Sequence, residues 1–520
     1  MKKEALSLTP RHRDAEKAIR VFSASQRLCV IGLAVLCGLH AQFGRGSGEW
    51  STTAADAQRS AWVRSDPKIS AASIEKGGFG LAWKLKLGNG AFSGDAVLLN
   101  GYIGYRGFRS LGYLADSQHI YAVDTDLGRL EWQKSLGAAA HGSGPCGGGI
   151  TAGVARAISA AFPPMPQVGR GPGRINPARS AVGEPDQGAV TLQQLAEREA
   201  RMRAAAATAP PAPRPGAAPP APPRRRPNYL HAISADGYFH SLYVSNGEEP
   251  EKPAPFLPSG AHAAGLVVLQ DTAYAVTTHG CGGAPNAVWA LDLDSHAVAS
   301  WERKPGDIAG ASGPAIAPDG TVYVTTTDGE LAILDGKTLQ PKSTYSAGAE
   351  FTSSPVLFQF HGQVLAAAAA HDNRIHLLDT AAPGKRYTPQ PIGFAPDALA
   401  TWQDPGGTRW ILASSPSAVT AWKLTEKDGA PALDPDWTSG DLASPGVPIV
   451  VNGVVFAFAT GSGSAPAALY AFDGTTGKPL WNSGSTVTAR GPASLSAAGT
   501  QIYLATHDGT LYAFGFPIEH

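Results

Sequence analysis

Hydrophobic and polar residues alternate in the stretch ALYAFDGTTGKPLWNSG, which lies near the C-terminus of the chain. Leu469, Ala471 and Asp473 alternate with the aromatic residues Tyr470 and Phe472, and a period of two is typical of a half-buried β-strand. The Gly-Thr-Thr-Gly sequence that follows favours a tight turn, and the next residues lead into a second strand that ends on Trp481. The stretch therefore predicts a β-hairpin.

Weaker copies of this pattern recur through most of the chain. The first copy is separated from the second by 119 residues, and the later copies follow one another at intervals of 42 to 50 residues. A period in the forties built from strand patterns is typical of four-stranded propeller blades. The residues that align with Asp473 are Asp124, Tyr243, Asp292, Asp335, Asp379, Lys423 and Gly515.

Large aromatic residues recur at the ends of these hairpins. Their spacing predicts that they pack between neighbouring blades, because aromatic side chains provide large apolar areas for contacts between sheets. Stacking on a carbohydrate or a cofactor is the alternative for any one of them. The candidates for blade docking are Trp83, Trp132, Trp301, Trp437 and Trp481.

The last repeat stops after its third strand, and the stretch LAWKLKL near the start of the repeats lacks the rest of its own blade. We therefore expect residues 81–87 to supply the missing fourth strand, which would leave no open sheet edge. The predicted fold is all-β: an eight-bladed β-propeller of four-stranded blades over residues 79–520. Residues 49–78 lack periodicity and are expected to wrap against it.

The N-terminal residues 1–48 combine a basic leader with the hydrophobic stretch LCVIGLAVLCGLHA, which contains Cys29 and Cys37. An apolar core of this length is typical of a signal peptide and short for a membrane span. The sequence predicts export to the periplasm or beyond, with cleavage near Ala41. An uncleaved N-terminal anchor is the alternative, and it would be the only contact with a membrane.

A proline- and arginine-rich insertion, residues 163–227, lies inside the second blade. It holds 15 of the 42 prolines, a composition that favours a disordered loop. A docking arm for a partner is the alternative. The chain has no formal net charge, but outside the basic leader and this insertion acids exceed bases by ten. This excess argues against nucleic acid as a partner.

Five histidines are predicted on one face of the propeller, because the loop before a blade's first strand and the turn between its second and third strands lie on the same side. They are His141, His262, His279, His371 and His507. They are either turn residues or a site near the axis for a metal or an anionic ligand, although no HxH or CxxC spacing supports a metal. A hydrolase that uses this face is a further alternative.

Cys146 and Cys281 fall on the same face, in neighbouring blades. In an exported protein such a pair is expected to form a disulfide, provided that the two Cα atoms approach to about 4.4–6.8 Å. The alternative is two buried, reduced cysteines.

The repeat LYAFDGTTGKPLW, with its relatives IYAVDTDLGRLEW and TTTDGELAILDGKTL, resembles the pyrroloquinoline quinone (PQQ) repeat over residues 79–516. The resemblance implies an eight-bladed propeller whose tryptophans dock neighbouring blades. Proteins with PQQ repeats include PQQ-dependent dehydrogenases and outer-membrane assembly scaffolds of the BamB type. The chain lacks the adjacent cysteines of the soluble alcohol dehydrogenases and a CxxCH haem motif.

Two functions follow from this resemblance. The first is an exported, non-catalytic propeller that acts as a monomer and binds an envelope protein or a small-molecule ligand. The second is a quinoprotein dehydrogenase that oxidises alcohols or sugars with PQQ and calcium. For that case Asp397 and Arg490 are the candidates for the base and for the group that polarises the quinone carbonyl, by their expected positions.

Overall fold

The computed structural model describes residues 50–104, 107–137, 144–163, 229–385, 387–462 and 465–517. Nearly all regular structure in these ranges is β-strand, which confirms the all-β prediction. The exceptions are the short helix α2 (Ala71–Glu75) and the 3-10 turn η2 (Cys281–Gly283). No helix in these ranges is long and apolar enough to cross a membrane. The predicted leader and nearly all of the predicted insertion lie outside the described residues.

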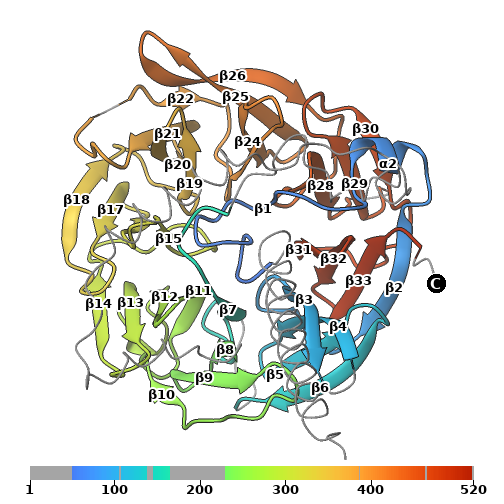
Figure 1. The fold of residues 1–520 in the computed structure, drawn as a ribbon. Coiled ribbons are helices and arrows are strands. Elements are labelled where there is room, and N and C mark those ends of the chain that lie inside the picture. The colour runs from blue at the N-terminus through green and yellow to red at the C-terminus, as the bar shows by residue number, and fades with distance from the viewer. Residues whose placement is uncertain are drawn as a thin grey trace, which may run out of the picture. The chain divides into compact units, whose positions relative to one another are not determined.

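The strands form successive antiparallel units of four, which Figure 1 shows arranged around a common centre. The first four units are β3 (Val97–Gly104), β4 (Gly107–Ala115), β5 (His119–Asp124) and β6 (Arg129–Ser135); β7 (Val154–Ile158), β8 (Tyr229–Ile233), β9 (Tyr238–Tyr243) and β10 (Ala254–Pro255); β11 (His262–Leu269), β12 (Thr272–Thr278), β13 (Ala287–Asp292) and β14 (Val298–Glu302); and β15 (Ala315–Ile316), β16 (Val322–Thr325), β17 (Glu330–Leu334) and β18 (Pro341–Ser346).

The second half of the chain continues the same pattern. Its units are β19 (Val356–Phe360), β20 (Gln363–Ala370), β21 (Arg374–Asp379) and β22 (Gln390–Pro391); β23 (Ala400–Gln403), β24 (Arg409–Ser414), β25 (Val419–Lys427) and β26 (Ala430–Thr438); β27 (Ile449–Val451), β28 (Val454–Ala459), β29 (Ala468–Asp473) and β30 (Pro479–Asn482); and β31 (Ala493–Ala498), β32 (Gln501–Thr506) and β33 (Thr510–Gly515).

Strand β2 (Gly80–Lys86) comes from the N-terminal part of the chain but pairs with the last strand, β33. The pairing is antiparallel and runs from Gly80 opposite Gly515 to Lys86 opposite Thr510. Figure 1 shows the blue β2 beside the red β33. Residues 81–87 therefore lie beside the C-terminal repeat, where the sequence places them.

Two pairings extend the units beyond four strands. Strands β7 and β11 pair in parallel near their ends, so that the second and third units form one eight-stranded sheet. Strand β1 (Trp62–Val63) pairs in parallel with β27 and adds a fifth strand to the seventh unit. In both cases the extra pairing involves the strands nearest the centre (Figure 1).

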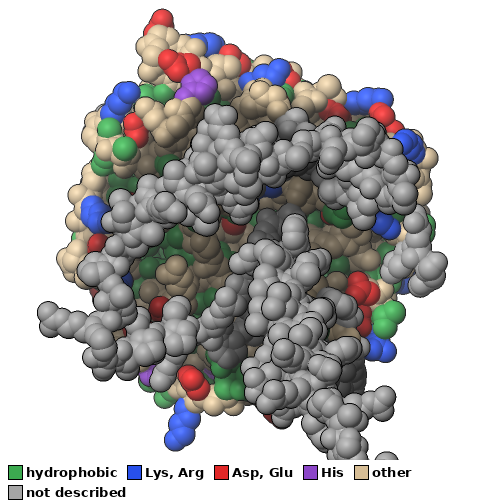
Figure 2. Space-filling view, viewed as in Figure 1, with side chains coloured by type: hydrophobic (Ala, Val, Ile, Leu, Met, Phe, Trp, Pro, Cys, Tyr) green, Lys and Arg blue, Asp and Glu red, His purple; other side chains and the backbone are tan. Residues whose placement is uncertain are grey.

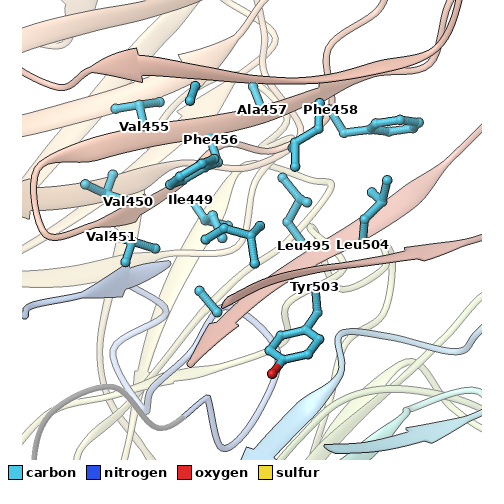
Figure 3. Close-up of a cluster of buried hydrophobic side chains, with 14 of the residues drawn as sticks. Ile449, Val450, Val451, Val455, Phe456, Ala457, Phe458, Leu495, Tyr503 and Leu504 are labelled. Carbon is cyan, nitrogen blue, oxygen red and sulfur yellow. The ribbon is translucent and has the colours of Figure 1, made fainter. Parts of the chain in front are cut away.

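Hydrophobic side chains fill the space between neighbouring units. Figure 3 shows one such cluster, in which residues of β27 and β28 face residues of β31 and β32. Phe456 and Leu504 are fully buried there, and Tyr503 is nearly so. On the face seen in Figure 2, Lys and Arg are interspersed with Asp and Glu around the rim. The apolar side chains thus hold the units together, and the rim is polar with mixed charge.

Three of the predicted docking tryptophans make the same contact with the turn of the following unit. The indole Nε1 of Trp83, Trp132 and Trp437 donates to the carbonyl oxygen of Thr125, Val244 and Gly474 respectively, at 2.9–3.1 Å. Each acceptor directly follows the residue that aligns with Asp473. The contact is therefore a property of the repeat.

The turn under each of these rings needs a glycine. Gly128, Gly247 and Gly477 have φ between +63° and +71°, and a Cβ atom there would lie 2.5–2.8 Å from the tryptophan ring. An L-residue would be strained by this φ and would also collide with the indole. In the first and last of these turns an Asp side chain accepts from backbone N–H groups two and three residues ahead, which fixes the loop.

The other two tryptophans also lie between units. Trp481 of β30 packs edge-on against Phe79, with ring centroids 5.0 Å apart, and against Phe514 of the last unit at 5.7 Å. Trp301 of β14 is half-buried against the apolar cluster formed by the third and fourth units. In the turn that follows in the fourth unit, Leu339 takes the place of the glycine, with φ +53°.

Candidate functional site

Residues 50–63, the axial segment, lie along the innermost strands of seven units. Backbone N–H groups of these strands donate to carbonyl oxygens of the segment, mostly from the second residue of each strand. In the third unit Thr52 donates its hydroxyl to the carbonyl of Leu266, at 2.6 Å. The backbone donors are Leu98, Arg156, Ile316, Leu357, Thr401 and Val450, and their acceptors are Trp50, Ser51, Ala57, Gln58, Ser60 and Ala61.

Arg59 anchors the middle of the axial segment. Its side chain is 1% exposed and donates to the carbonyls of Pro314 and Gly265, both at 2.9 Å, and to that of Thr53 at 2.8 Å. Burial lowers the pKa of Arg59 to about 10, so that it stays protonated at neutral pH. A buried guanidinium needs such acceptors because an unsatisfied buried charge is strongly unfavourable.

Asp95 ties the start of the axial segment to the first unit. Its Oδ2 accepts from Trp50 Nε1 at 3.1 Å and from the backbone N–H of Ala54 at 2.9 Å. Desolvation raises the pKa of Asp95 to about 6, and these two hydrogen bonds and the charge of Arg59 oppose that rise. The sequence predicts that residues 49–78 wrap against the propeller, and it does not single out Arg59 or Asp95.

The disulfide joins Cys146, in the loop before β7, to Cys281, in η2 between β12 and β13. The Cα atoms are 5.2 Å apart, within the range that a disulfide requires. This is the predicted pair, and it links the second unit to the third across 135 residues of chain.

Two of the predicted histidines meet beside this disulfide. The rings of His262, the first residue of β11, and His279, which follows β12, have centroids 5.4 Å apart. The backbone N–H of His279 donates to Asp307 Oδ2 at 2.8 Å, and its Nδ1 lies 3.4 Å from the same oxygen. The sequence analysis did not single out Asp307, because it lies in the loop that leads to the next unit.

The environment of His262 disfavours its charged form. Burial lowers the pKa of His262, and the neighbouring His279 lowers it further, whereas the Pro145 backbone and Asp307 act in the opposite direction. Its Nδ1 is buried without a hydrogen-bond partner. A neutral His262 therefore has a ring nitrogen that could exchange a hydrogen bond with a ligand.

The other predicted site residues lie in different places. His371 is exposed, and its Nε2 lies 3.9 Å from Glu350 in the fifth unit. His507 lies in the last unit beside Gly491, where a Cβ atom would come within 3.1 Å of its Nδ1. His141 lies outside the described residues. Within the part of the chain that the structure describes, no three His, Cys, Asp or Glu residues are placed to hold a metal ion.

The candidate catalytic residues also lie apart from the axial segment. Asp397 is an exposed residue of the loop before β23, and Arg490 is an exposed residue of the loop before β31. These loops lead into the sixth and eighth units, two units apart along the chain.

Comparison with known proteins places the chain in a structural class. A family profile described as "Outer membrane protein assembly factor BamB" matches residues 397–515. No curated protein matches the sequence significantly. The range 397–515 that the family profile matches includes three of the repeats found in the sequence.

Solved structures of low sequence identity share the fold. A quinohemoprotein alcohol dehydrogenase from Comamonas testosteroni matches with a TM-score of 0.56 and 14% identity, over 92% of this chain and 83% of that chain. A europium-containing methanol dehydrogenase matches with a TM-score of 0.57 and 12% identity, over 92% of this chain and 99% of that chain. BamB from Moraxella catarrhalis matches with a TM-score of 0.49 and 12% identity, over 85% of this chain and 99% of that chain.

These matches confirm the resemblance to PQQ-repeat β-propellers that the repeats predicted. The solved structures that share the fold include dehydrogenases, whereas the matching family profile describes an assembly factor. Fold alone does not decide between them.

Proposed function

We propose that this protein is an exported, non-catalytic PQQ-repeat propeller that acts as a binding or scaffold protein in the cell envelope. The observation that carries the proposal is the axial segment. Its backbone accepts hydrogen bonds from the inner strands of six units near their first residues, the Thr52 hydroxyl contacts a seventh, and the buried Arg59 holds its centre. A flat ligand near the axis would compete with these hydrogen bonds.

The proposed architecture is a closed wheel of eight blades, the last of which is completed by β2. Two contacts between the last and first units support it. Trp83 of β2 donates to the carbonyl of Thr125 in the first unit, and Ser494 of β31 donates to the carbonyl of Gly94 at 3.1 Å. Closure removes the two open edges that a linear array of sheets would have.

The proposed location is the periplasm or the cell surface, reached through the N-terminal signal sequence, with an uncleaved anchor as the alternative. The disulfide supports a compartment that permits oxidised cysteines. The partner would be an envelope protein or a small-molecule ligand, and the propeller would act as a monomer.

The alternative is a dehydrogenase that uses PQQ with calcium. The described residues do not fit that cofactor, because the axial segment already occupies the inner strands and Asp397 and Arg490 are exposed in separate loops. The metal would need several oxygen ligands in one place. We therefore derive no reaction step through the quinone.

A cofactor-binding experiment separates the two functions. The purified protein is incubated with PQQ and Ca²⁺, passed through gel filtration, and assayed for dye reduction with alcohols and sugars. We expect no quinone absorbance in the protein fraction and no dye reduction, with a quinoprotein dehydrogenase as the positive control. Retained quinone together with substrate-dependent dye reduction would overturn the proposal.

A further inference from the structure

The buried Arg409 and the partly buried Arg64 lie close to one tryptophan at the end of the axial segment. The guanidinium carbon of Arg64 lies 4.4 Å from the ring centroid of Trp62, and that of Arg409 lies 5.5 Å from the same centroid. Arg64 directly follows β1, and Arg409 is the first residue of β24. The two guanidinium groups therefore share one aromatic surface, although they lie 345 positions apart in the sequence.

The polar partners of Arg409 are neutral. Its Nε donates to the carbonyl of Gln359 and its Nη2 to Oε1 of Gln403, both at 3.2 Å, while the residue is only 5% exposed. Burial lowers the pKa of Arg409 to about 9, and the charge of Arg64 lowers it further. Among the described residues no carboxylate lies within ion-pair distance of Arg409, and both of its side-chain acceptors are neutral, so its charge is not balanced by an acid in contact with it.

Arg64 is only partly balanced. Its Nη1 lies 3.5 Å from Asp56 Oδ2, and its Nε is buried without a hydrogen-bond partner. Asp56 also accepts from the backbone N–H of Gln58 and from both the N–H and the hydroxyl of Ser60. Asp56 contacts Arg64 but not Arg409, so among the described residues the two guanidinium groups have one ion-pairing carboxylate between them, which leaves one positive charge in excess.

An uncompensated buried cation is unfavourable, and a planar guanidinium is the side chain best suited to bind a carboxylate through two parallel hydrogen bonds. We infer that Arg64 and Arg409 form a binding site for one carboxylate group, seated against Trp62 at the side of the propeller where β23 ends and β24 begins. A single negative charge balances the excess, which favours a carboxylate over a dianionic phosphate.

The site is distinct from the His262–His279 pair. β1 runs parallel to β27, so Arg64 lies beyond the end of an inner strand, whereas His262 begins one and His279 follows β12. The inference does not depend on the proposed scaffold function. A carboxylate on a small organic acid and one on a peptide present the same chemistry, and the probes below distinguish them.

Binding is measured on the full exported chain by line broadening of ¹³C-labelled acetate, at fixed pH and ionic strength with chloride as the background anion. A second titration uses a short peptide with a free C-terminal carboxylate, and its C-terminal amide serves as the matched probe. We expect acetate to bind to the wild-type protein. Stronger binding of the free-acid peptide than of acetate would assign the site to a peptide, and equal binding would assign it to a small acid.

Arg409→Gln is expected to weaken acetate binding by about tenfold or more, because it removes the unbalanced charge. Arg409→Lys keeps the charge but not the forked geometry, so it should also weaken binding while preserving the fold. Arg129→Gln is the control, since Arg129 is half-exposed and already paired with Glu131. Unchanged binding in both Arg409 variants would overturn the inference.

Two further results would also overturn it. One is the absence of acetate broadening by the wild-type protein, a measurement that needs no variant. The other is tenfold tighter binding of inorganic phosphate than of acetate, which would contradict the assignment to a single negative charge.

Discussion

At the scale of single residues, the notable groups are charges placed in the interior of an all-β protein. Arg59 is satisfied by backbone carbonyls of the third and fourth units, and Asp95 by an indole and a backbone N–H. Such groups fix the position of a segment that has no regular structure over most of its length. Burial shifts the pKa values of these groups, so the effect of each group on the free energy of unfolding can be measured as a function of pH.

The pKa of Asp95 predicts a pH effect on stability. Because the folded-state pKa is raised to about 6, the folded protein holds a proton that the unfolded chain releases near pH 4. Stability from this group is therefore present at low pH and is lost as pH rises from about 4 to about 6. Relative to wild type, Asp95→Asn should gain about 1–3 kcal/mol of unfolding free energy between pH 4 and pH 7.

Urea denaturation at several pH values measures this change, with Asp319→Asn in an exposed turn as the control for the substitution itself. A difference between Asp95→Asn and wild type that does not vary with pH would contradict the prediction.

Arg59 gives a second prediction at this scale. Arg59→Met removes the charge but leaves the carbonyls of Pro314, Gly265 and Thr53 without their donor. We expect a loss of about 3–5 kcal/mol in unfolding free energy, as when one partner of a buried polar contact is removed. Arg129→Met, at a half-exposed position, should change it by less than about 1 kcal/mol. Equal effects in the two variants would show that Arg59 carries no special role.

At the scale of elements, the repeat is a hairpin whose turn receives a tryptophan from the preceding unit. The turn glycine serves two purposes, since it adopts positive φ and leaves space for the ring. The two effects can be separated, because other turns need a glycine for its positive φ but have no ring beside it. Gly429, in the β25–β26 turn, has φ +73° and no atom within 4 Å of a Cβ position.

Gly477→Ala is expected to cost more than Gly429→Ala. Both substitutions place an alanine at positive φ, which costs about 1 kcal/mol. Only at Gly477 does the new Cβ meet a ring, that of Trp437 at 2.7 Å, so an additional cost of about 1–3 kcal/mol is expected. The two midpoints of urea unfolding provide the comparison. In the double variant with Trp437→Ala the extra cost should vanish, and its persistence would refute the steric explanation.

The disulfide gives a prediction for two neighbouring units. Replacing both Cys146 and Cys281 by serine should destabilise the protein by about 2–5 kcal/mol, because the bridge closes a long loop in the unfolded chain. Urea unfolding of the variant and of the wild type with and without reductant measures it. The reduced wild type should resemble the variant; if all three unfold alike, the bridge does not stabilise the fold.

At the scale of the whole molecule, the sequence predicts the repeating part well and the centre poorly. Strand alternation and the interval between repeats are local signals, so the strands, the pairing of β2 with β33 and the disulfide could be predicted. The axial segment could not, because it has no periodicity and its partners extend from Leu98 to Val450. The sequence also gives no sign that Arg409 belongs to a site, because its position is that of an ordinary first residue of a strand.

The five-histidine face shows the same limit. Its members share a side of the propeller by topology, yet the structure brings only His262 and His279 into contact, since each of the others belongs to a different unit or lies outside the described residues. Sequence position gives the face on which a residue lies but not its distance from the axis.

The pairing of β2 with β33 has a consequence for synthesis and secretion. A chain that emerges from the ribosome or crosses a membrane with its N-terminus leading would present residues 80–86 first and their partner, residues 510–515, last. Until the final residues arrive, the early strand must wait unpaired in a growing polypeptide. A truncated or stalled product would therefore display exposed sheet edges, which gives proteases and chaperones a direct means of distinguishing unfinished molecules from complete ones.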